Sequence, residues 1–583
     1  MSKPNDRVRH SFLKGSLVLG VSMLIVKLIG MFYKIILTNM LGVVGNGILS
    51  VTYELYNPLF MLATAGFPIA ISRMVSESVA TKRYNDVKKI HRVSVPFLFI
   101  TGILGFLIML ASSFAYCNIA QTPSALPAVI CLSPTILFAC LMSIYRGYYE
   151  GQRNMMPTAI SEIIEAVSKL VIGLVISYLT LQYGLNQYRT TGKFLGVVYK
   201  NEDLAQAAIV PYAVAAAFIG ISLGAFFGFV FLLLRHKIKG EGITKQEYAQ
   251  SPPARDGKST FNRLVRTAIP IGTGALIMSF AGLIDTILVN NRLKNIMDTN
   301  PSALLKQYGN LIPADVVFNN TTHTFLFGCF SLSLTIMMLI TALTQVFGQS
   351  ALPSVTNAYA RGNRKDLKYN IETVIKTTCI FTLPAGLGLT VLAQPILSLL
   401  YTSRPNEITI AANVLQIMGI SGIFIATSTP LCSMLQAVGC VDLPLKLFAV
   451  GMVIKVALNY LLVGIPAINI QGATVGSLVC YAMVCFVALY YLCKQTKIIP
   501  NFNLVLIKPL IASAFCAITA YFSYQLFDMK FSNKIAVILA IVAAIIIYAI
   551  MLLILRVITK NDLLSIPKGE KIAKTLEKFH LIG

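Results

Sequence analysis

The sequence predicts an all-α polytopic membrane protein with 14 transmembrane helices, built as two pseudo-symmetric six-helix lobes plus two extra C-terminal helices. Composition, the spacing of apolar stretches and an internal repeat predict this fold. Hydrophobic residues make up 56% of the 583 residues and charged residues 12%, and the mean hydropathy is +0.73. Such values exclude a soluble globular protein.

Apolar stretches of the length needed to cross a membrane follow one another along the whole chain. A bilayer core about 30 Å thick requires about 20 apolar residues per helix. The fourteen stretches that meet this requirement lie near 12–40, 47–71, 93–116, 125–147, 157–182, 206–234, 264–290, 322–348, 371–401, 407–436, 444–465, 470–493, 504–526 and 533–557. We expect each of them to be a transmembrane helix.

Residues 12–41 and 264–293 are two copies of one element. Aligned without a gap, they are identical at seven positions, where roughly two or three identities are expected by chance in so apolar a chain. These positions are Gly20/Gly272, Leu24/Leu276, Ile25/Ile277, Gly30/Gly282, Ile35/Ile287, Asn39/Asn291 and Leu41/Leu293. Segments 75–88 and 355–368 match at a larger offset, which indicates an insertion between 293 and 320. A weaker third match joins 151–169 to 439–455.

The longest internal polar segment, 235–266, separates the two copies and predicts the domain boundaries. We expect an N-terminal lobe with helices 1–6 at 1–240, a cytoplasmic linker at 241–263 and a C-terminal lobe with helices 7–12 at 264–498. Helices 13 and 14 occupy 499–558, and a cytoplasmic tail follows at 559–583. The linker sequence GKST at 257–260 resembles the end of a phosphate-binding loop, but Pro252 stands where that motif needs its first glycine. An ATPase is therefore not expected.

Basic residues predict the orientation in the membrane. With both termini in the cytoplasm, most of the 48 Lys and Arg residues fall on the cytoplasmic side, as the positive-inside rule requires. We interpret the net charge of +25 as the result of basic residues that fix the topology and attract anionic lipid headgroups. We expect no nucleic-acid partner. The localisation predicted is a multi-pass protein of the cell membrane. A cleavable signal peptide is not expected, since Lys27 and Lys34 interrupt a first helix that is too long for one.

The eleven cysteines lie almost entirely within the predicted spans and show no CxxC or Cys/His spacing. A structural zinc site needs clustered ligands, so we interpret these cysteines as small apolar side chains. No metal site and no cofactor are expected.

Charges inside the predicted spans are the candidates for a functional site. Each costs about 2.5–3.5 kcal/mol near a helix centre, so such residues are retained where they pair or line a wet cavity. The first lobe offers cations together with acidic and amide groups: Lys27, Lys34, Glu54, Asn57, Arg73 and Arg146. A cavity with these groups suits an anionic, hydroxyl-rich ligand such as a sugar phosphate.

Structural interpretations of the same residues stay open. Lys27 pairs with Glu54 in one of them, while Lys34 extends to the outer interface. Arg73 and Arg146 lie at helix ends, where basic residues anchor a helix at the membrane boundary.

Further charges lie on the fifth helix and in the second lobe. Glu162, Glu165 and Lys169 form one polar stripe, in which Glu165 and Lys169 can neutralise each other along the helix. In the second lobe the deepest charges are Asp285 and Lys455, which we expect to pair. Asn459 follows Lys455 by one turn and shares its face. Glycines at 220, 224 and 228 predict a close helix approach.

Several local motifs carry a resemblance to a known family. In the first lobe they are KLIGMFYK at 27–34, AGFPIAISR at 65–73, RGYYEGQ at 146–152 and MPTA at 156–159. In the second lobe they are AIPI at 268–271, LIDT at 283–286, NRL at 291–293 and KVALNY at 455–460. The chain thereby resembles the polysaccharide-biosynthesis branch of the multidrug/oligosaccharidyl-lipid/polysaccharide (MOP) exporter superfamily, close to the stage V sporulation protein B and MurJ-type lipid II flippases.

This resemblance implies two six-helix lobes around a central cavity, where cationic residues receive the pyrophosphate of a lipid-linked saccharide. The family's basic cavity positions map onto Lys34 and Arg73, and also onto Lys27. Helices 13 and 14 are expected to add a groove for the polyprenyl tail. A sodium site described for some members maps onto Asp285, Lys455 and Asn459. A lysine ammonium would fill the place of the ion, so the resemblance does not imply sodium coupling here.

The function predicted is that of a monomeric flippase, with no catalytic residues, which moves an undecaprenyl-pyrophosphate-linked saccharide to the outer leaflet by alternating access. The precursor that the resemblance favours is lipid II. The alternatives are a flippase for an exopolysaccharide or teichoic acid precursor and a cation-coupled multidrug exporter. A membrane glycosyltransferase or ligase is a third class, but the first external loop, 41–47, has no charge that would serve as a catalytic acid or base.

Overall fold

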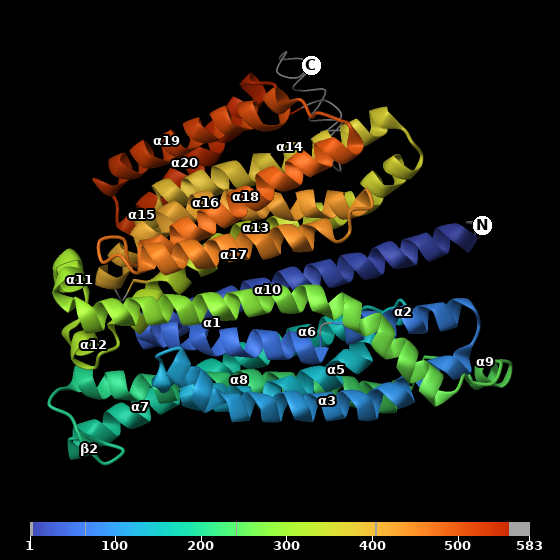
Figure 1. Cartoon of the computed structure of the whole chain (residues 1–583), viewed down its shortest axis with the longest axis horizontal. Coiled ribbons are helices and arrows are strands. Elements are labelled where there is room, and N and C mark those ends of the chain that lie inside the picture. The colour runs from blue at the N-terminus through green and yellow to red at the C-terminus, as the bar shows by residue number, and fades with distance from the viewer. Residues whose placement is uncertain (1–3, 65, 241, 403–404, 559–583) are drawn as a thin grey trace. The chain divides into compact units, whose positions relative to one another are not determined.

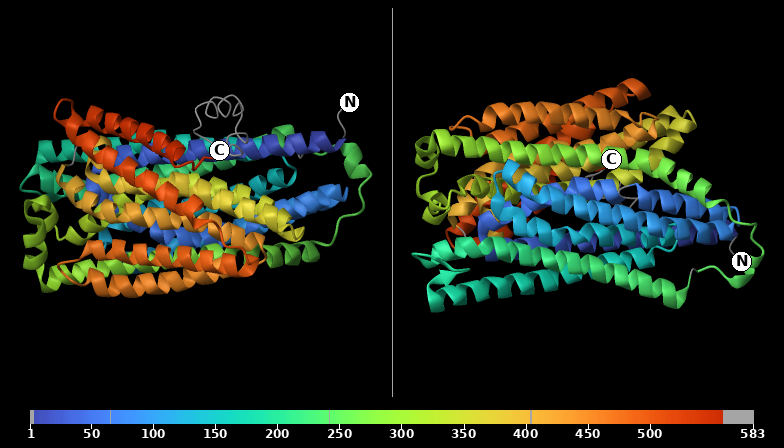
Figure 2. Two further views of the ribbon diagram at one scale, coloured as in Figure 1. Left: turned by 90° about the horizontal axis from the view of Figure 1, so that it is seen from above. Right: turned by 60° about the horizontal axis from the view of Figure 1, so that its bottom comes forward.

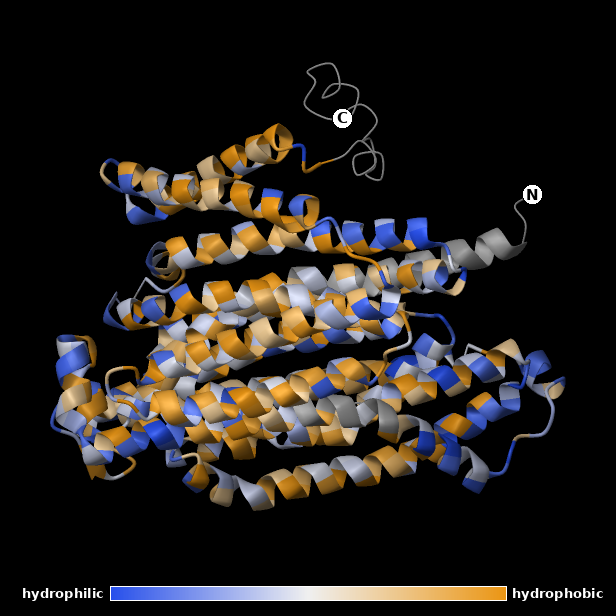
Figure 3. Ribbon diagram, turned by 45° about the horizontal axis from the view of Figure 1, so that its top comes forward, coloured by the Kyte–Doolittle hydropathy of each residue, from blue (hydrophilic) through white to orange (hydrophobic). Residues whose placement is uncertain are grey.

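The computed structural model describes residues 4–64, 66–240, 242–402 and 405–558. Within them the regular secondary structure is helical apart from one short hairpin of strands β1 (Lys193–Phe194) and β2 (Val197–Val198). Hydrophobic residues dominate the middle of the helices, and hydrophilic residues gather at helix ends and in connecting segments (Figure 3). This distribution is that of helices whose central parts face lipid or each other.

The chain forms two compact units, which are described separately. The first comprises Met1–Lys294 and Pro313–Gly328, and the second comprises Asn295–Ile312 and Cys329–Gly583. The first unit thus includes most of the helix at 257–299, which the repeat assigns to the second lobe. The lobe boundaries remain predictions, because the units follow packing and the lobes follow the repeat.

Helices α1 to α10 build the first unit (Figure 1). Their bounds are α1 Pro4–Thr64, α2 Phe67–Ala80, α3 Tyr84–Ile119, α4 Leu126–Leu132, α5 Pro134–Gly151, α6 Met156–Ser168, α7 Leu174–Thr191, α8 Glu202–Lys239, α9 Lys245–Ala249 and α10 Gly257–Thr299, with a 3₁₀ turn η1 at Pro123–Ala125 and a π-helical turn η2 at Lys169–Gly173. Helices α7 and α8 pack along each other (Figure 2). A core of residues from α2, α3, α5 and α8 includes Ile71, Leu98 and Tyr148.

The second unit begins with the short helix α11 and continues with the bundle of α13 to α20. Their bounds are α11 Pro301–Tyr308, α13 Thr322–Ala360, α14 Arg364–Val391, α15 Ala393–Leu400, α16 Pro405–Ala437, α17 Leu443–Val463, α18 Ile470–Thr496, α19 Lys508–Asp528 and α20 Asn533–Ile554, with η3 at Gly309–Leu311 and a π-helical turn η4 at Asn503–Ile507. Helix α12 (Ala314–Phe318) and the first turns of α13 belong to the first unit. A core between α13, α14, α16 and α18 includes Val355, Met434 and Val484.

Eleven helical stretches among the described residues are long and apolar enough to cross a membrane. They account for twelve of the fourteen predicted spans, because the first stretch, Val21–Ala80, contains two of them. Helix α1 runs through both across a kink at Gly42, where φ is 73°, a backbone conformation that favours glycine. The other two predicted spans, 157–182 and 264–290, coincide with α6–α7 and α10. The total of fourteen remains a prediction.

The internal repeat appears in the geometry of the turns. Helix α2 ends and α3 begins across residues 81–83, and α13 ends and α14 begins across 361–363, which are the positions paired by the repeat. In the predicted insertion, α11, η3 and α12 form short helices. The duplicated sequence therefore folds into duplicated local structure at these turns.

Glycines on α8 allow the close approach that their spacing predicts. A Cβ atom on Gly220 would collide with the backbone of Gly173 in η2, and one on Gly224 would lie 2.8 Å from the carbonyl oxygen of Glu165. A Cβ on Gly228 would lie 2.9 Å from the sulfur of Met142. Helix α8 therefore packs directly against the backbone of the helix that carries the polar stripe.

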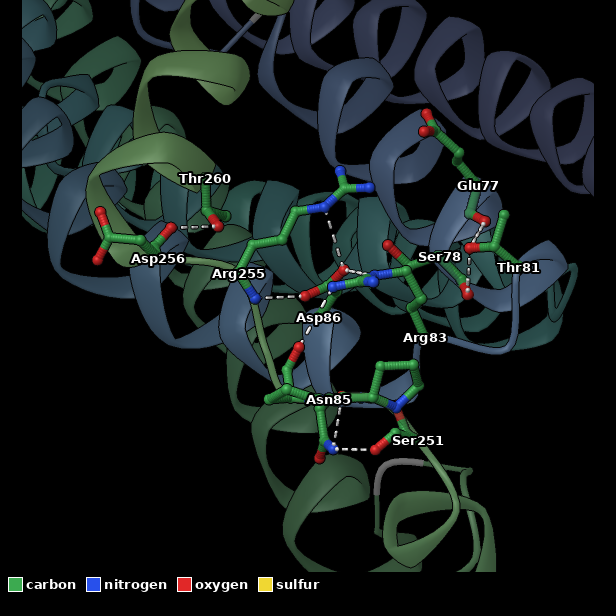
Figure 4. A network of polar contacts seen from close by, with 12 residues as sticks. Glu77, Ser78, Thr81, Arg83, Asn85, Asp86, Ser251, Arg255, Asp256 and Thr260 are labelled. Carbon is green, nitrogen blue, oxygen red and sulfur yellow. Dashed lines mark hydrogen bonds and ion pairs between the residues drawn. The ribbon is translucent and has the colours of Figure 1, made fainter.

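The linker before α10 is docked on the turn between α2 and α3 (Figure 4). Asp86 is buried and accepts hydrogen bonds from Arg83 Nε at 2.5 Å and from the backbone N–H of Arg255 at 2.7 Å. The Asn85 side chain donates to the carbonyls of Ser251 and Pro252, each at 3.1 Å. These contacts hold the segment that leads into α10.

The equivalent carboxylate in the other repeat makes simpler contacts. Asp366 is exposed and accepts a hydrogen bond from the side chain of Asn363, at 2.7 Å. Burial and linker docking therefore distinguish Asp86 from its repeat partner.

Replacing Asp86 with Ala should release the linker, because Arg83 and the Arg255 N–H lose their acceptor at a cost of about 1–3 kcal/mol. This corresponds to roughly a fivefold or greater rise in local opening. Limited trypsin digestion of the purified protein, followed at Arg255 and Lys258, measures that opening. Asp366→Ala is the matched control and should leave the cleavage rate unchanged; equal rates in the two variants would contradict the docking role.

Candidate functional site

A polar cavity of about 340 Å³ lies within the first unit, among α1, α5 and α6. Five of the residues that line it are ionisable, although the surrounding helices are apolar. The lining comprises Met23, Val26, Lys27, Ile29, Gly30, Arg146, Glu162, Glu165, Ala166 and Lys169. Three cations and two carboxylates thus face one space.

Arg146, near the C-terminal end of α5, is held by two neighbours on α6. Its Nη2 donates to Oε2 of Glu165 at 3.0 Å, and its Nε donates to the hydroxyl of Ser161 at 3.1 Å. The side chains of Arg146 and Glu165 are 20% and 33% exposed, so the ion pair is reachable from the cavity. The guanidinium has donors left for a planar acceptor such as a phosphate.

Lys169 is held by aromatic residues of α1. Its Nζ donates to the hydroxyl of Tyr53 at 3.1 Å and lies 4.8 Å from the centre of the Tyr33 ring, a cation–π contact. Lys169 is also the first residue of the π-helical turn η2, and such turns recur at functional sites. The sequence allowed Glu165 and Lys169 to neutralise each other; in the structure Glu165 pairs with Arg146, and Lys169 donates to Tyr53.

Glu162 and Lys27 complete the charged wall. Oε2 of Glu162 accepts a hydrogen bond from the Ser22 hydroxyl at 3.4 Å. Lys27 is exposed on α1 and lines the cavity. The structure therefore brings Lys27 and Arg146, two of the predicted site residues, to one cavity.

The other first-lobe candidates do not line this cavity. Lys34 is half-buried and experiences the charges of Lys169 and Glu54. The Glu54 carboxylate lies against α10, where a Cβ on Gly282 would come within 2.8 Å of its Oε2. Asn57 is half-buried in α1, and Arg73 is exposed on α2.

The predicted second-lobe charges are buried. Asp285 on α10 and Lys455 on α17 are each 7% exposed, and Asn459 is fully buried. Gly476 on α18 leaves room for the Asn459 amide, with which a Cβ at that position would collide. Asp285 belongs to the first unit and Lys455 to the second, so their pairing remains a prediction.

Sequence reasoning identified the stripe of Glu162, Glu165 and Lys169 without assigning it to the site. The charge spacing was the available signal, since three ionisable groups on one face of an apolar helix point to a common wet surface. No signal in the sequence identifies Ser161, whose role depends on the packing of α5 against α6. The sequence does predict Tyr53 as a hydrogen-bonding group near Glu54, and the structure places its hydroxyl against Lys169. Among the described residues there is no group of three or more His, Cys, Asp or Glu side chains placed to hold a metal ion.

Comparison with known proteins confirms the predicted resemblance. A family model described as polysaccharide biosynthesis protein matches residues 12–311, and a model described as MatE matches 314–461. Stage V sporulation protein B of Bacillus subtilis (strain 168) is 24% identical over 582 residues, covering 96% of this chain and 98% of that protein. Lipid II flippase MurJ of the same strain is 24% identical over 471 residues, covering 79% and 78%.

A solved structure of lipid II flippase MurJ in an inward closed conformation has the same fold. It superposes with a TM-score of 0.54 at 14% identity and covers 92% of this chain and 98% of its own. Because the first family model spans more than half of the sequence, the chain belongs to the polysaccharide biosynthesis protein family of the MOP superfamily.

Proposed function

We propose that this protein is a flippase that moves a polyprenyl-pyrophosphate-linked saccharide, with lipid II as the first candidate, from the inner to the outer leaflet. The observation that supports the proposal is the charged cavity of the first unit, where Lys27, Arg146 and Lys169 face the same 340 Å³. The name of the relative MurJ supports lipid II as the cargo. The family supports a transporter that carries lipid-linked saccharides without catalysing a reaction.

The balance of charge in the cavity suits a pyrophosphate. Three cations exceed two carboxylates by one, and Glu165 already occupies part of the Arg146 guanidinium. A pyrophosphate that enters the cavity competes with Glu165 for Arg146 and gains a charge-assisted, bidentate contact. Lys27 and Lys169 then neutralise its remaining charge as point cations.

The saccharide and the tail of the cargo need different surroundings. The hydroxyl of the half-buried Tyr53 lies beside Lys169 and offers a hydrogen bond to a sugar hydroxyl. Ser161 is fully buried and its hydroxyl donates to the Thr158 carbonyl, so it positions Arg146 only. The polyprenyl tail stays in the bilayer, and apolar side chains exposed on α19 and α20, such as Phe522 and Ile545, form its groove. The two lobes rock about the site in alternating access.

The membrane potential is sufficient to drive this export without a nucleotide. Moving negative charge outward from a negative interior is downhill by about 2.3 kcal/mol per charge per 100 mV. A pyrophosphate carrying more than one charge gains a proportionally larger drive.

A cation-coupled multidrug exporter is the second candidate function. The observation that favours it is the pair of carboxylates, Glu162 and Glu165, in the same cavity, since carboxylates attract organic cations. Uptake of a cationic dye into proteoliposomes, without flipping of lipid II, would favour the exporter. Flipping of a teichoic acid or exopolysaccharide precursor in place of lipid II would assign a different cargo to the same mechanism.

Replacing Arg146 with Gln should reduce flipping of fluorescent lipid II in proteoliposomes by roughly ten- to hundredfold. The reason is the loss of charge-assisted hydrogen bonds worth about 1.5–3 kcal/mol each. Arg189→Gln is the matched control, because Arg189 forms an exposed ion pair with Glu202 at the far end of α7. Size-exclusion profiles establish that both variants are folded. Undiminished flipping by a folded Arg146→Gln protein would rule out this cavity as the pyrophosphate site.

Flipping should proceed at the same rate when Na⁺ is replaced by K⁺ or choline on both sides of the vesicle. The sodium site of some family members maps onto a position that is Lys455 here, one turn before Asn459. A sodium ion needs an uncharged or acidic oxygen ligand there, and a lysine ammonium provides none. Initial rates at a fixed membrane potential provide the measurement. A rate that falls several-fold without Na⁺ would contradict this prediction.

A further inference from the structure

A second cavity, of about 510 Å³, lies within the second unit and is separate from the charged cavity of the first. It is bounded by α15, the first turns of α16 and the connection between α19 and α20. Figure 1 shows α15 at the end of the helices where α19 joins α20. The residues that line it are Gln394, Ser398, Thr402, Pro405, Asn406, Ile408, Thr409, Ser532, Asn533 and Lys534.

The chemistry of this lining differs from that of the first cavity. Eight of these ten residues are polar and seven of the eight are uncharged amides or hydroxyls, with Lys534 as the single ion. No carboxylate is among them. Amides and hydroxyls both donate and accept hydrogen bonds, as a ligand rich in hydroxyl groups requires.

Within the described residues, much of the hydrogen-bonding capacity of the pocket is not used. The Thr409 hydroxyl donates to the carbonyl of Pro405, and the Asn406 amide donates to that of Asn310, over long distances of 3.3 and 3.4 Å. Asn533 accepts from Tyr524 at 3.0 Å. The remaining polar side chains make no hydrogen bond to another described group: Gln394, Ser398, Thr402, Ser532 and Lys534.

The polar side chains are mounted on a rigid support. Gln394 and Ser398 are four residues apart and lie on one face of α15, and Thr402 follows the end of this helix. Ala393 and Leu397, on the adjacent face of the helix, are fully buried. A cluster that includes Leu392, Cys516, Ala520 and Ala544 packs the start of α15 against α19 and α20. The backbone that carries Gln394 and Ser398 is therefore held in place before a ligand binds.

The pocket depends on the two helices that follow the repeats. Ser532, Asn533 and Lys534 belong to the connection between α19 and α20, which has no counterpart in the first repeat. Helix α14 begins with the basic residues Arg364, Lys365 and Lys368, and its other end leads into α15. By the positive-inside rule the basic end of α14 is cytoplasmic. The other end, and with it α15 and the pocket, then lies on the external side.

We propose that this pocket is an external binding site for the saccharide of the cargo, and that it receives the sugar headgroup as the lipid reaches the outer leaflet. The role of this pocket in transport rests on the proposed function. Its chemistry fits a hydroxyl-rich sugar that is neutral or carries one acidic group opposite Lys534. Pro405 and Ile408 supply a small apolar surface against which a sugar ring can pack.

Saturation-transfer NMR on the full-length protein in nanodiscs tests the proposal with soluble probes. The probes are chitotetraose as a neutral amino sugar, an oligogalacturonate as an acidic one, and glycerol phosphate as the headgroup of an ordinary phospholipid. We expect both saccharides to bind at millimolar concentration and glycerol phosphate to bind at least fivefold more weakly. Stronger binding of glycerol phosphate would assign the pocket to bilayer lipid and overturn the proposal, as would no saccharide binding.

Two variants locate the binding. Ser398→Leu fills the pocket from α15 and should weaken both saccharides at least fivefold, whereas Lys534→Gln should weaken only the acidic one. Lys530→Gln is the control, because Lys530 lies in the same connection but does not line the pocket.

Arg146→Gln distinguishes this proposal from the proposed function. That variant should lose flipping and keep saccharide binding. Saccharide binding that depends on Arg146 and not on Ser398 would place the sugar in the first cavity and overturn the external site.

Discussion

The ion pair between Arg146 and Glu165 is the interaction on which the site of the first unit depends. A charge inside an apolar bundle has to be partnered or wet, and this pair is both. Helix α8 fixes the geometry of this pair, because its glycines let it pack against the backbone of α6 near Glu165. With α8 so close, the side chains of Glu162, Glu165 and Lys169 extend towards α1 and α5, where the cavity lies. Larger residues on α8 would move the whole stripe.

The two repeats share local structure and have diverged in chemistry. The turns at 81–83 and 361–363 have the same form, but only Asp86 is buried under the linker. The cavity with five ionisable residues belongs to the first repeat, and the pocket lined mainly by amides and hydroxyls belongs to the second repeat with α19 and α20. This division matches the two parts of the proposed cargo's headgroup, because pyrophosphate requires cations, and a saccharide requires hydroxyls and amides.

The helical membrane fold, the repeat and the family could be predicted from the sequence, since they depend on residue type and spacing along the chain. The glycine contacts of α8 were predicted for the same reason. The site was predicted less completely. Lys27 and Arg146 line the cavity, whereas Lys34 and Arg73 do not, because the direction in which a helix faces depends on packing that spacing alone does not fix. The partner of Glu165 also required the structure, since Arg146 lies on another helix and competes with the nearer Lys169.

The proposed function depends on an exchange in which pyrophosphate displaces Glu165 from Arg146. Calorimetric titration of the purified protein with farnesyl pyrophosphate tests this exchange most directly when wild type, Glu165→Gln and Arg146→Gln are compared. Glu165→Gln removes the internal competitor, so we expect this variant to bind several-fold more tightly than wild type. We expect Arg146→Gln to bind at least tenfold more weakly. Equal affinities in all three proteins would rule out this exchange.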